Sequence, residues 1–173
     1  MRGSVSDGVT CQPIADTLLS SYISEMGNDY IASTYESIQG GSDLVKWFGT
    51  VPIFHDAEIL SFSLDHAGPS RLVLHGWNMT NLVGTDGYFV LEKRAVVTFV
   101  LKEITDLQLE GFARQNVIDE LCLSRVTPDS GFSCLDLQTE SPVVFEILLE
   151  HCYGLSGYIR GRGVSVSFVP DPL

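Results

Sequence analysis

Basic side chains are scarce in this sequence. Lysine and arginine together number 10, against 22 aspartates and glutamates, which gives a formal net charge of -12. Because nucleic acids and anionic lipids are themselves negative, most of this surface would repel them at long range. The composition therefore argues against nucleic-acid and membrane partners, and a basic macromolecule is the more natural partner. A solvated acidic surface with no basic partner is the commoner alternative.

Cysteine patterns of metal type are also missing. The four cysteines, Cys11, Cys122, Cys134 and Cys152, form no CxxC pair and show no short metal-type spacing. The N-terminal residues carry no apolar core of signal-peptide length, and no apolar run approaches the length of a membrane span. We therefore expect a cytoplasmic protein whose cysteines are ordinary reduced thiols.

Familiar catalytic motifs are absent as well. The sequence has no GxSxG nucleophile elbow, and no cysteine stands in a recognisable protease context. The Arg-Gly-Arg-Gly run at residues 160–163 lacks the lysine and hydroxyl residue of a Walker phosphate loop and opens no helix. It predicts a hairpin turn between Tyr158 and Val164. Its arginines form a local basic patch that can bind an anionic group or pair with acids on the same surface.

The chain does contain enough apolar material for one folded domain. Hydrophobic residues make up 45% of its 173 residues and charged residues 18%, which is close to the usual globular composition. Residues 1–12 are small and polar and are expected to form a disordered tail. Residues 13–173 are expected to form a single domain, because no internal repeat or shift in composition divides them.

The N-terminal part of that domain shows helical periodicity. Apolar positions over residues 13–26 recur at helical spacing and predict an amphipathic helix. A second helical piece is predicted over residues 30–38. Asp43 is then expected to cap a short turn that runs through Trp47 and that Gly49 closes.

After Pro52 the apolar period changes from helical to alternating. In the first such segment Leu60, Phe62 and Leu64 fall on one face and serines on the other, which is typical of a half-buried strand. Eight strands are predicted, over residues 58–65, 72–77, 88–91, 96–101, 117–123, 132–137, 143–149 and 164–169. Because no helix-length connections separate them, a parallel arrangement is disfavoured. We expect an α+β, β-rich fold: an antiparallel sheet, sandwich or open barrel of about eight strands with an N-terminal helical segment.

The segment from Trp47 to Glu58 concentrates aromatic and titratable residues just before the first strand. Phe54 is large enough to anchor this segment in a core. If residues 56–58 are extended, the carboxylates of Asp56 and Glu58 point to one face, and the imidazole of His55 completes a metal site or an acid/base pair. In the alternative, His55 and Asp56 bond nearby backbone groups and fix the start of the strand.

The remaining histidines favour the alternative in which His55 and Asp56 bond backbone groups. The other histidines, His66, His75 and His151, show no spacing that supplies more metal ligands. Six aromatic residues form either a recognition surface or, as is commoner in sheet proteins, part of the core: Trp47, Phe48, Phe54, Trp77, Tyr88 and Phe89.

A family resemblance rests on two stretches of the chain. The first is Pro-Ile-Phe-His-Asp-Ala-Glu at residues 52–58, followed by the strand-like residues 59–65 and by Gly-Pro-Ser at residues 68–70. The second is Tyr-Gly-Leu-Ser-Gly at residues 153–157, before the last predicted strand. Over residues 44–169 the chain resembles a bacterial immunity family, the one numbered fifty among polymorphic-toxin immunity proteins. The resemblance implies a cytoplasmic, non-enzymatic protein, encoded beside a secreted toxin, that binds and neutralises the toxin domain by occlusion.

In that interpretation Trp47, Phe54, His55, Asp56 and Glu58 serve either the partner surface or the fold, and no catalytic residue, metal or cofactor is expected. The acidic surface suits a basic toxin domain. A small metal-dependent or acid/base enzyme that uses His55, Asp56 and Glu58 is the alternative. A ligand-binding barrel with an apolar cavity is a third possibility.

Overall fold

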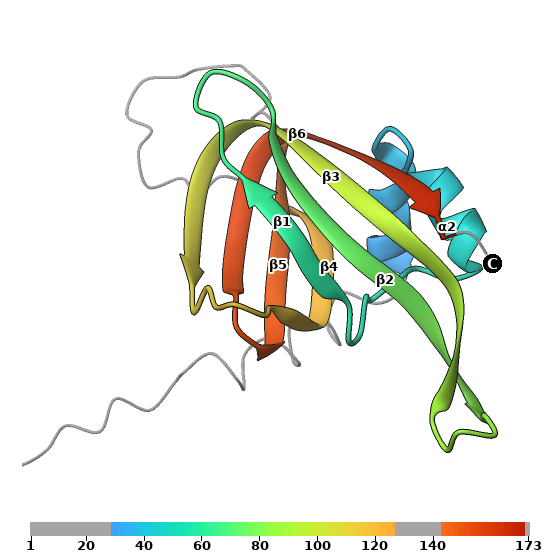
Figure 1. Ribbon diagram of the computed structural model, residues 1–173. Coiled ribbons are helices and arrows are strands. Elements are labelled where there is room, and N and C mark those ends of the chain that lie inside the picture. Colours follow the sequence, from blue (N-terminus) through green and yellow to red (C-terminus); the bar gives the residue numbers. More distant parts are fainter. Residues whose placement is uncertain (1–28, 127–142, 172–173) are drawn as a thin grey trace, which may run out of the picture.

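Strands dominate the structure, a computed structural model that describes residues 29–126 and 143–171. In this part of the chain six antiparallel strands close into a barrel in the order β1-β2-β3-β6-β5-β4, and two short helices precede them (Figure 1). The elements are a helix over residues 29–37, α2 (Gly41–Phe48), β1 (Glu58–Ser63), β2 (Ser70–Val83), β3 (Phe89–Glu110), β4 (Val117–Val126), β5 (Val144–Tyr153) and β6 (Ser156–Pro170). The predicted β-rich, antiparallel class with an N-terminal helical segment is confirmed.

The structure describes six strands where eight were predicted, for two reasons. The segments predicted at residues 88–91 and 96–101 belong to one long strand, β3. The predicted strand at residues 132–137 lies outside the described residues, as do the predicted tail at residues 1–12 and the predicted helix at residues 13–26. Neither helix in the described part of the chain is long and apolar enough to cross a membrane.

The predicted hairpin turn between Tyr158 and Val164 is wrong, because β6 runs through this segment without a break. Gly161 pairs with β3 on one side and with β5 on the other. A Cβ atom at this position would lie 2.9 Å from the carbonyl oxygen of Lys102. The glycine therefore permits a close approach of neighbouring strands and does not mark a turn.

The two arginines of this segment pair with acids, as the sequence allowed. The Nε atom of Arg160 lies 2.6 Å from Oε2 of Glu146, whose side chain is almost fully buried, and Nη1 of Arg162 lies 3.7 Å from Oε2 of Glu103. The basic patch is thus largely neutralised by carboxylates on adjacent strands.

The alternation predicted for β1 is interrupted by a bulge. Ile59 pairs with Leu74 and Ser61 pairs with Val73, so Leu60 is an extra residue in the ladder. A bulge of this kind turns the following side chains relative to the sheet. Ile59 is consequently buried, Leu60 is half exposed, and Phe62 packs against the core.

Large apolar side chains fill the interior of the barrel. The fully buried ones on the strands are Leu72, Leu74, Val97, Phe99, Leu101, Ile118, Leu123, Ile147, Leu149 and Ile159. Tyr35, Leu44 and Phe48 from the two helices join the same core. The helices therefore cover the end of the barrel beside the C-terminal half of β6, where the amide of Val166 donates to the carbonyl oxygen of Gln39 at 2.9 Å (Figure 1).

The helix predicted over residues 30–38 is confirmed, but Asp43 does not cap the next one. α2 begins after Gly40, which has a left-handed backbone, and no side chain caps it. Asp43 lies in its first turn, where a carboxylate still favours the positive end of the helix dipole. Gly49 ends α2 in a left-handed conformation, as predicted.

Two parts of β3 extend beyond the closed ring. Past the pair Gly76 and Ala95, residues 78–92 of β2 and β3 pair only with each other and form a projecting hairpin, which we call the arm (Figure 1). At the other end, β3 pairs with β2 only as far as Leu101 but with β6 as far as Glu110. Among the described residues, no strand pairs with the other side of residues 102–110, which we call the open edge.

Candidate functional site

The connector, which we define as residues 49–57, joins α2 to β1 in a strained but well-held conformation. Phe54 and Asp56 have left-handed backbones, with φ of 58° and 61°. This conformation costs a residue such as Phe54 about 1–2 kcal/mol, whereas aspartate tolerates it better. The amide of Asp56 donates to the carbonyl oxygen of Ile118 at 3.0 Å, and Leu121 donates to that of Ile53 at 2.9 Å. Hydrogen bonds to β4 thus impose this turn. The extended backbone considered for residues 56–58 does not form at Asp56.

Phe54 anchors the connector in the barrel core. Its side chain is only 2% exposed, and its ring meets Phe48 and Phe99 edge-on, with centroid distances of 5.8 and 6.0 Å. Gly76 of β2 leaves room for it, because a Cβ there would lie 2.7 Å from the Phe54 ring. Trp47 packs on Phe168 of β6 at 5.6 Å. Trp47 and Phe54, both singled out from the sequence, therefore have packing roles in the structure.

His55 lies on the surface between two carboxylates. Its Nδ1 atom is 3.1 Å from Oδ1 of Asp119 and its Nε2 atom is 3.7 Å from Oδ2 of Asp56. Nδ1 also lies 3.0 Å from the carbonyl oxygen of Asp119, to which it donates when it carries the proton. Because each of these side chains is more than 40% exposed, the ion pairs add little stability. The backbone contact matches the structural alternative.

Asp119 and Cys152 form a surface cluster with His55 and Asp56, and neither was identified as a site residue from the sequence. The Sγ atom of Cys152 is 3.8 Å from Oδ1 of Asp56 and 3.7 Å from Oδ1 of Asp119. Asp119 and Cys152 are the two unpaired residues where the register between β4 and β5 shifts. Such bulges redirect side chains, which brings these two toward the connector. No motif or spacing along the chain predicts that Asp119 and Cys152 lie beside His55.

Glu58 stands apart from this cluster. It begins β1 opposite His75 of β2 and Val117 of β4, and in the described part of the chain its carboxylate makes no hydrogen bond or ion pair with His55 or Asp56. No group of histidine, cysteine, aspartate and glutamate side chains suited to a metal ion occurs within residues 29–126 and 143–171. In the described residues His55 and Asp56 therefore lie together, whereas Glu58 is not part of their cluster.

The electrostatics of the cluster favour a protonated thiol. Partial burial raises the pKa of Cys152, and the carboxylates of Asp119 and Asp56 raise it further. A nucleophilic cysteine requires the opposite, a positive environment that stabilises the thiolate. We expect that iodoacetamide modifies Cys152 slowly at neutral pH, and that Asp119→Asn accelerates the reaction by about threefold or more.

Mass spectrometry of the peptide that contains Cys152 measures this rate. Cys122 is the internal control, because its burial and nearby carboxylates raise its pKa to about 11, so it should stay unmodified in both proteins. An unchanged rate at Cys152 in the Asp119→Asn variant would show that the carboxylate does not control the thiol.

Glu120, next to Asp119, makes stability depend on pH. Burial, followed by the negative charge of Asp119, raises its pKa above the ordinary 4.5, while His55 acts in the opposite direction. A raised carboxyl pKa stabilises the folded state at low pH and costs stability as the pH rises through it. Glu120→Gln should therefore raise the free energy of unfolding at neutral pH, with the gain vanishing below about pH 4.5.

Urea denaturation across that pH range tests this expectation. Glu36→Gln, on the exposed face of the helix over residues 29–37, is the matched control and should change little at any pH. Destabilisation of Glu120→Gln at neutral pH would contradict the assigned environment.

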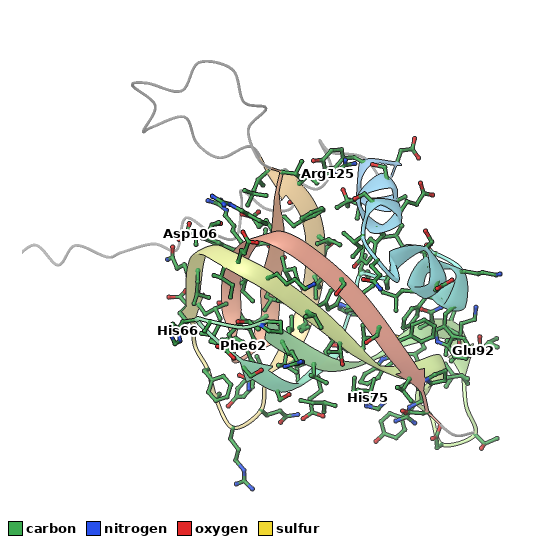
Figure 2. The ribbon with its side chains drawn as sticks, turned by 90° about the horizontal axis from the view of Figure 1, so that it is seen from above. Phe62, His66, His75, Glu92, Asp106 and Arg125 are labelled. Atoms are coloured by element: carbon green, nitrogen blue, oxygen red, sulfur yellow. The ribbon has the colours of Figure 1, made fainter. Side chains whose placement is uncertain are left out.

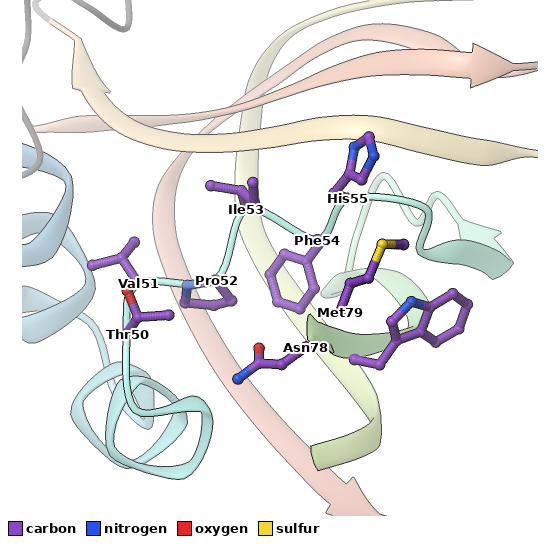
Figure 3. Close-up of a pocket in the computed structure, with 9 residues that line it drawn as sticks. Thr50, Val51, Pro52, Ile53, Phe54, His55, Asn78 and Met79 are labelled. Atoms are coloured by element: carbon purple, nitrogen blue, oxygen red, sulfur yellow. The ribbon is translucent and has the colours of Figure 1, made fainter. Parts of the chain in front are cut away.

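A cavity of about 370 Å³ opens beside the connector. Residues 50–55 of the connector line it together with Trp77, Asn78 and Met79 of β2 (Figure 3). Ile53 and Met79 at the cavity are substantially exposed. Asn78 ties the base of the arm to the end of α2, because its Nδ2 donates to the carbonyl oxygen of Phe48 at 2.8 Å. The cavity thus lies where the connector and the arm meet.

The arm presents large apolar side chains to solvent. Tyr88 is 76% and Phe89 55% exposed, and Leu82 and Val83 are exposed to a similar degree. The turn between them is ordered: the amide of Gly84 donates to the carbonyl oxygen of Tyr88 at 2.7 Å, and Oδ1 of Asp86 accepts from the Tyr88 amide at 3.1 Å. Of the six aromatic residues considered from the sequence, Phe48 and Phe54 are core, whereas Tyr88 and Phe89 form an exposed pair.

Comparison of the chain with protein-family models, with curated protein sequences and with solved structures finds no match.

Proposed function

We propose that this protein is an immunity protein that binds a cognate bacterial toxin in the cytoplasm and neutralises it by occlusion, without chemistry of its own. The observation that carries the proposal is the arm, a short ordered hairpin whose tip exposes Tyr88 and Phe89. Exposed apolar groups on a rigid support are typical of protein-binding surfaces, and aromatic residues dominate their binding energy.

The connector supports this role by fixing the base of the arm. Phe54 anchors the connector in the core, and Asn78 joins the arm to the end of α2. The cavity between them offers an apolar recess, with Ile53 and Met79 beside it, for a side chain of the partner. A partner that meets a prearranged surface loses less conformational entropy on binding.

The charge of the chain indicates the kind of toxin domain. A net charge of -12 attracts a basic partner at long range and speeds association. The proposed toxin domain is therefore basic, and its complex should form more slowly as salt is added.

The proposal predicts that a gene for a toxin domain lies beside this one, and the direct test is co-expression with that domain. We expect the two proteins to co-purify as a stable complex through size-exclusion chromatography, and cells that carry both to survive. Two folded proteins that do not associate when mixed would count decisively against the proposal.

A further inference from the structure

The arm leaves the barrel at a bulge in β3. Past the pair of Gly76 with Ala95, the register between β2 and β3 shifts by one residue. Trp77 of β2 therefore lies opposite two residues of β3, Lys93 and Arg94. A bulge of this kind bends its strand and interrupts the regular pairing. It stands at the point where the ring of the barrel ends and the arm begins.

Lys93 has a strained backbone in this bulge. Its φ of 50° is left-handed, a conformation that glycine adopts freely and that is costly for lysine. Strain of this kind persists only where the surrounding contacts impose it. The contacts around the base of the arm therefore hold the bulge in place, and Lys93 would relax if they were released.

Asp171, directly after β6, contacts both strands at the base of the arm. Its amide donates to the carbonyl oxygen of Arg94 at 2.9 Å. Its Oδ2 atom lies 3.7 Å from Nε of Arg94 and 2.7 Å from Nε2 of His75, which lies beside the end of β6 (Figure 2). The side chains of His75 and Asp171 are only 20% and 29% exposed, so water and salt screen this contact less than the pairs around His55. His75 in turn meets Trp77 edge-on at 5.3 Å.

The end of α2 holds the other side of the same base. The Nδ2 atom of Asn78 donates to the carbonyl oxygen of Phe48 at 2.8 Å. A Cβ atom at Gly49 would lie 3.2 Å from Nζ of Lys93. The ammonium group of Lys93 therefore lies at the C-terminal end of α2, where a positive charge is favourable. The bulge is thus held between the end of β6 and the end of α2.

We propose that the bulge at Lys93 and Arg94 is the hinge of the arm, and that Asp171 is the latch that keeps the arm fixed to the barrel. Hinges are a few residues that absorb a large change in backbone angles. When the latch opens, Lys93 returns to an unstrained backbone and the arm moves relative to the ring. This device goes beyond the proposed function, because it belongs to the free protein and does not depend on a toxin domain.

Limited digestion of the full chain with trypsin tests the latch, because the hinge itself carries two trypsin sites, after Lys93 and after Arg94. A protease cuts a strand through its local opening. We expect Asp171→Ala to accelerate cleavage at the hinge about tenfold, as mass spectrometry of the fragments measures. Cleavage after Arg160, which pairs with β3 on one side and β5 on the other, reports unfolding of the barrel and should keep its rate.

Glu58→Ala is the matched control for the latch. Glu58 is exposed and lies opposite His75 on β1. The variant therefore removes a carboxylate beside the same histidine and leaves Asp171 in place. Its cleavage at the hinge should match that of the wild type.

A second pair of variants tests the strain at the hinge. Lys93→Ala and Lys93→Gly both remove the ammonium group, but only glycine adopts the left-handed backbone freely. The strain that favours opening is therefore kept in the first variant and relieved in the second. Cleavage after Arg94 should be about fivefold slower in Lys93→Gly than in Lys93→Ala.

Four results would overturn the inference. They are an unchanged rate at the hinge in Asp171→Ala, an equal acceleration after Arg160, the same acceleration in Glu58→Ala, and cleavage in Lys93→Gly that is as fast as in Lys93→Ala. The second result would show that Asp171 supports the whole barrel and not the arm. None of them involves a toxin domain, so a failure here leaves the toxin-binding proposal standing.

Discussion

Phe54→Ala is expected to lower the free energy of unfolding by about 3–5 kcal/mol, the usual range for removing a buried aromatic ring. The ring is 2% exposed and contacts Phe48 and Phe99 edge-on. Its loss leaves a space that Gly76, which carries no side chain, cannot fill. The left-handed turn at residues 54–56 also loses the anchor that opposes its strain. Urea denaturation followed by circular dichroism measures the effect.

Ile53→Ala is the matched control, because it changes the adjacent residue in the same connector. Ile53 is 54% exposed, so the change should alter the free energy of unfolding by only about 0.5 kcal/mol. Similar losses in the two variants would show that the connector is not anchored through Phe54.

If the proposed function holds, replacing the exposed aromatic pair at the tip of the arm, Tyr88→Ser with Phe89→Ser, should weaken binding of the proposed toxin domain about 100-fold, or about 2.7 kcal/mol. Both side chains face solvent, and the turn that presents them is held by backbone bonds and Asp86. The fold should therefore be preserved, with an unchanged unfolding midpoint. Isothermal titration calorimetry of the toxin domain with each protein measures the loss.

Leu60→Ser supplies the control for this double variant. Leu60 is also about half exposed, but it lies on the bulge of β1, away from the arm. It should bind the toxin domain like the wild type. Full binding by the double variant, or equal weakening by Leu60→Ser, would remove the arm from the proposed interface.

The fold class could be predicted from the sequence because its signals are local. Alternating apolar residues marked most of the described strands, helical spacing marked the helix over residues 29–37, and Gly49 marked the end of α2. What escaped prediction depends on strand pairing. In the sequence, Gly161 and its neighbours indicate a turn, but in the structure Gly161 lies in β6, close to the backbone of β3 and paired with β5. Leu60 fits an alternating pattern in the sequence, but a bulge in β1 turns it outward.

In the candidate site, too, the local features could be predicted from the sequence, whereas the features that depend on strand pairing could not. Phe54 could be predicted to anchor the segment from Trp47 to Glu58 in the core, because a large aromatic residue in a short connector is visible in the local sequence. The partners of His55 could not be predicted, because Asp119 and Cys152 reach the connector only through register shifts between β4 and β5. The exposure of Tyr88 and Phe89 likewise follows from the length of β2 and β3 beyond the barrel.

The central claim is that this protein acts by occupying a surface of its partner and not by transforming a substrate. Its most direct test is a titration of toxin activity with the wild type, with His55→Gln and with the arm double variant. The account predicts complete inhibition at one equivalent of the wild type, the same curve for His55→Gln, and a large loss for the double variant. Inhibition at far below one equivalent that disappears in a folded His55→Gln variant would contradict it.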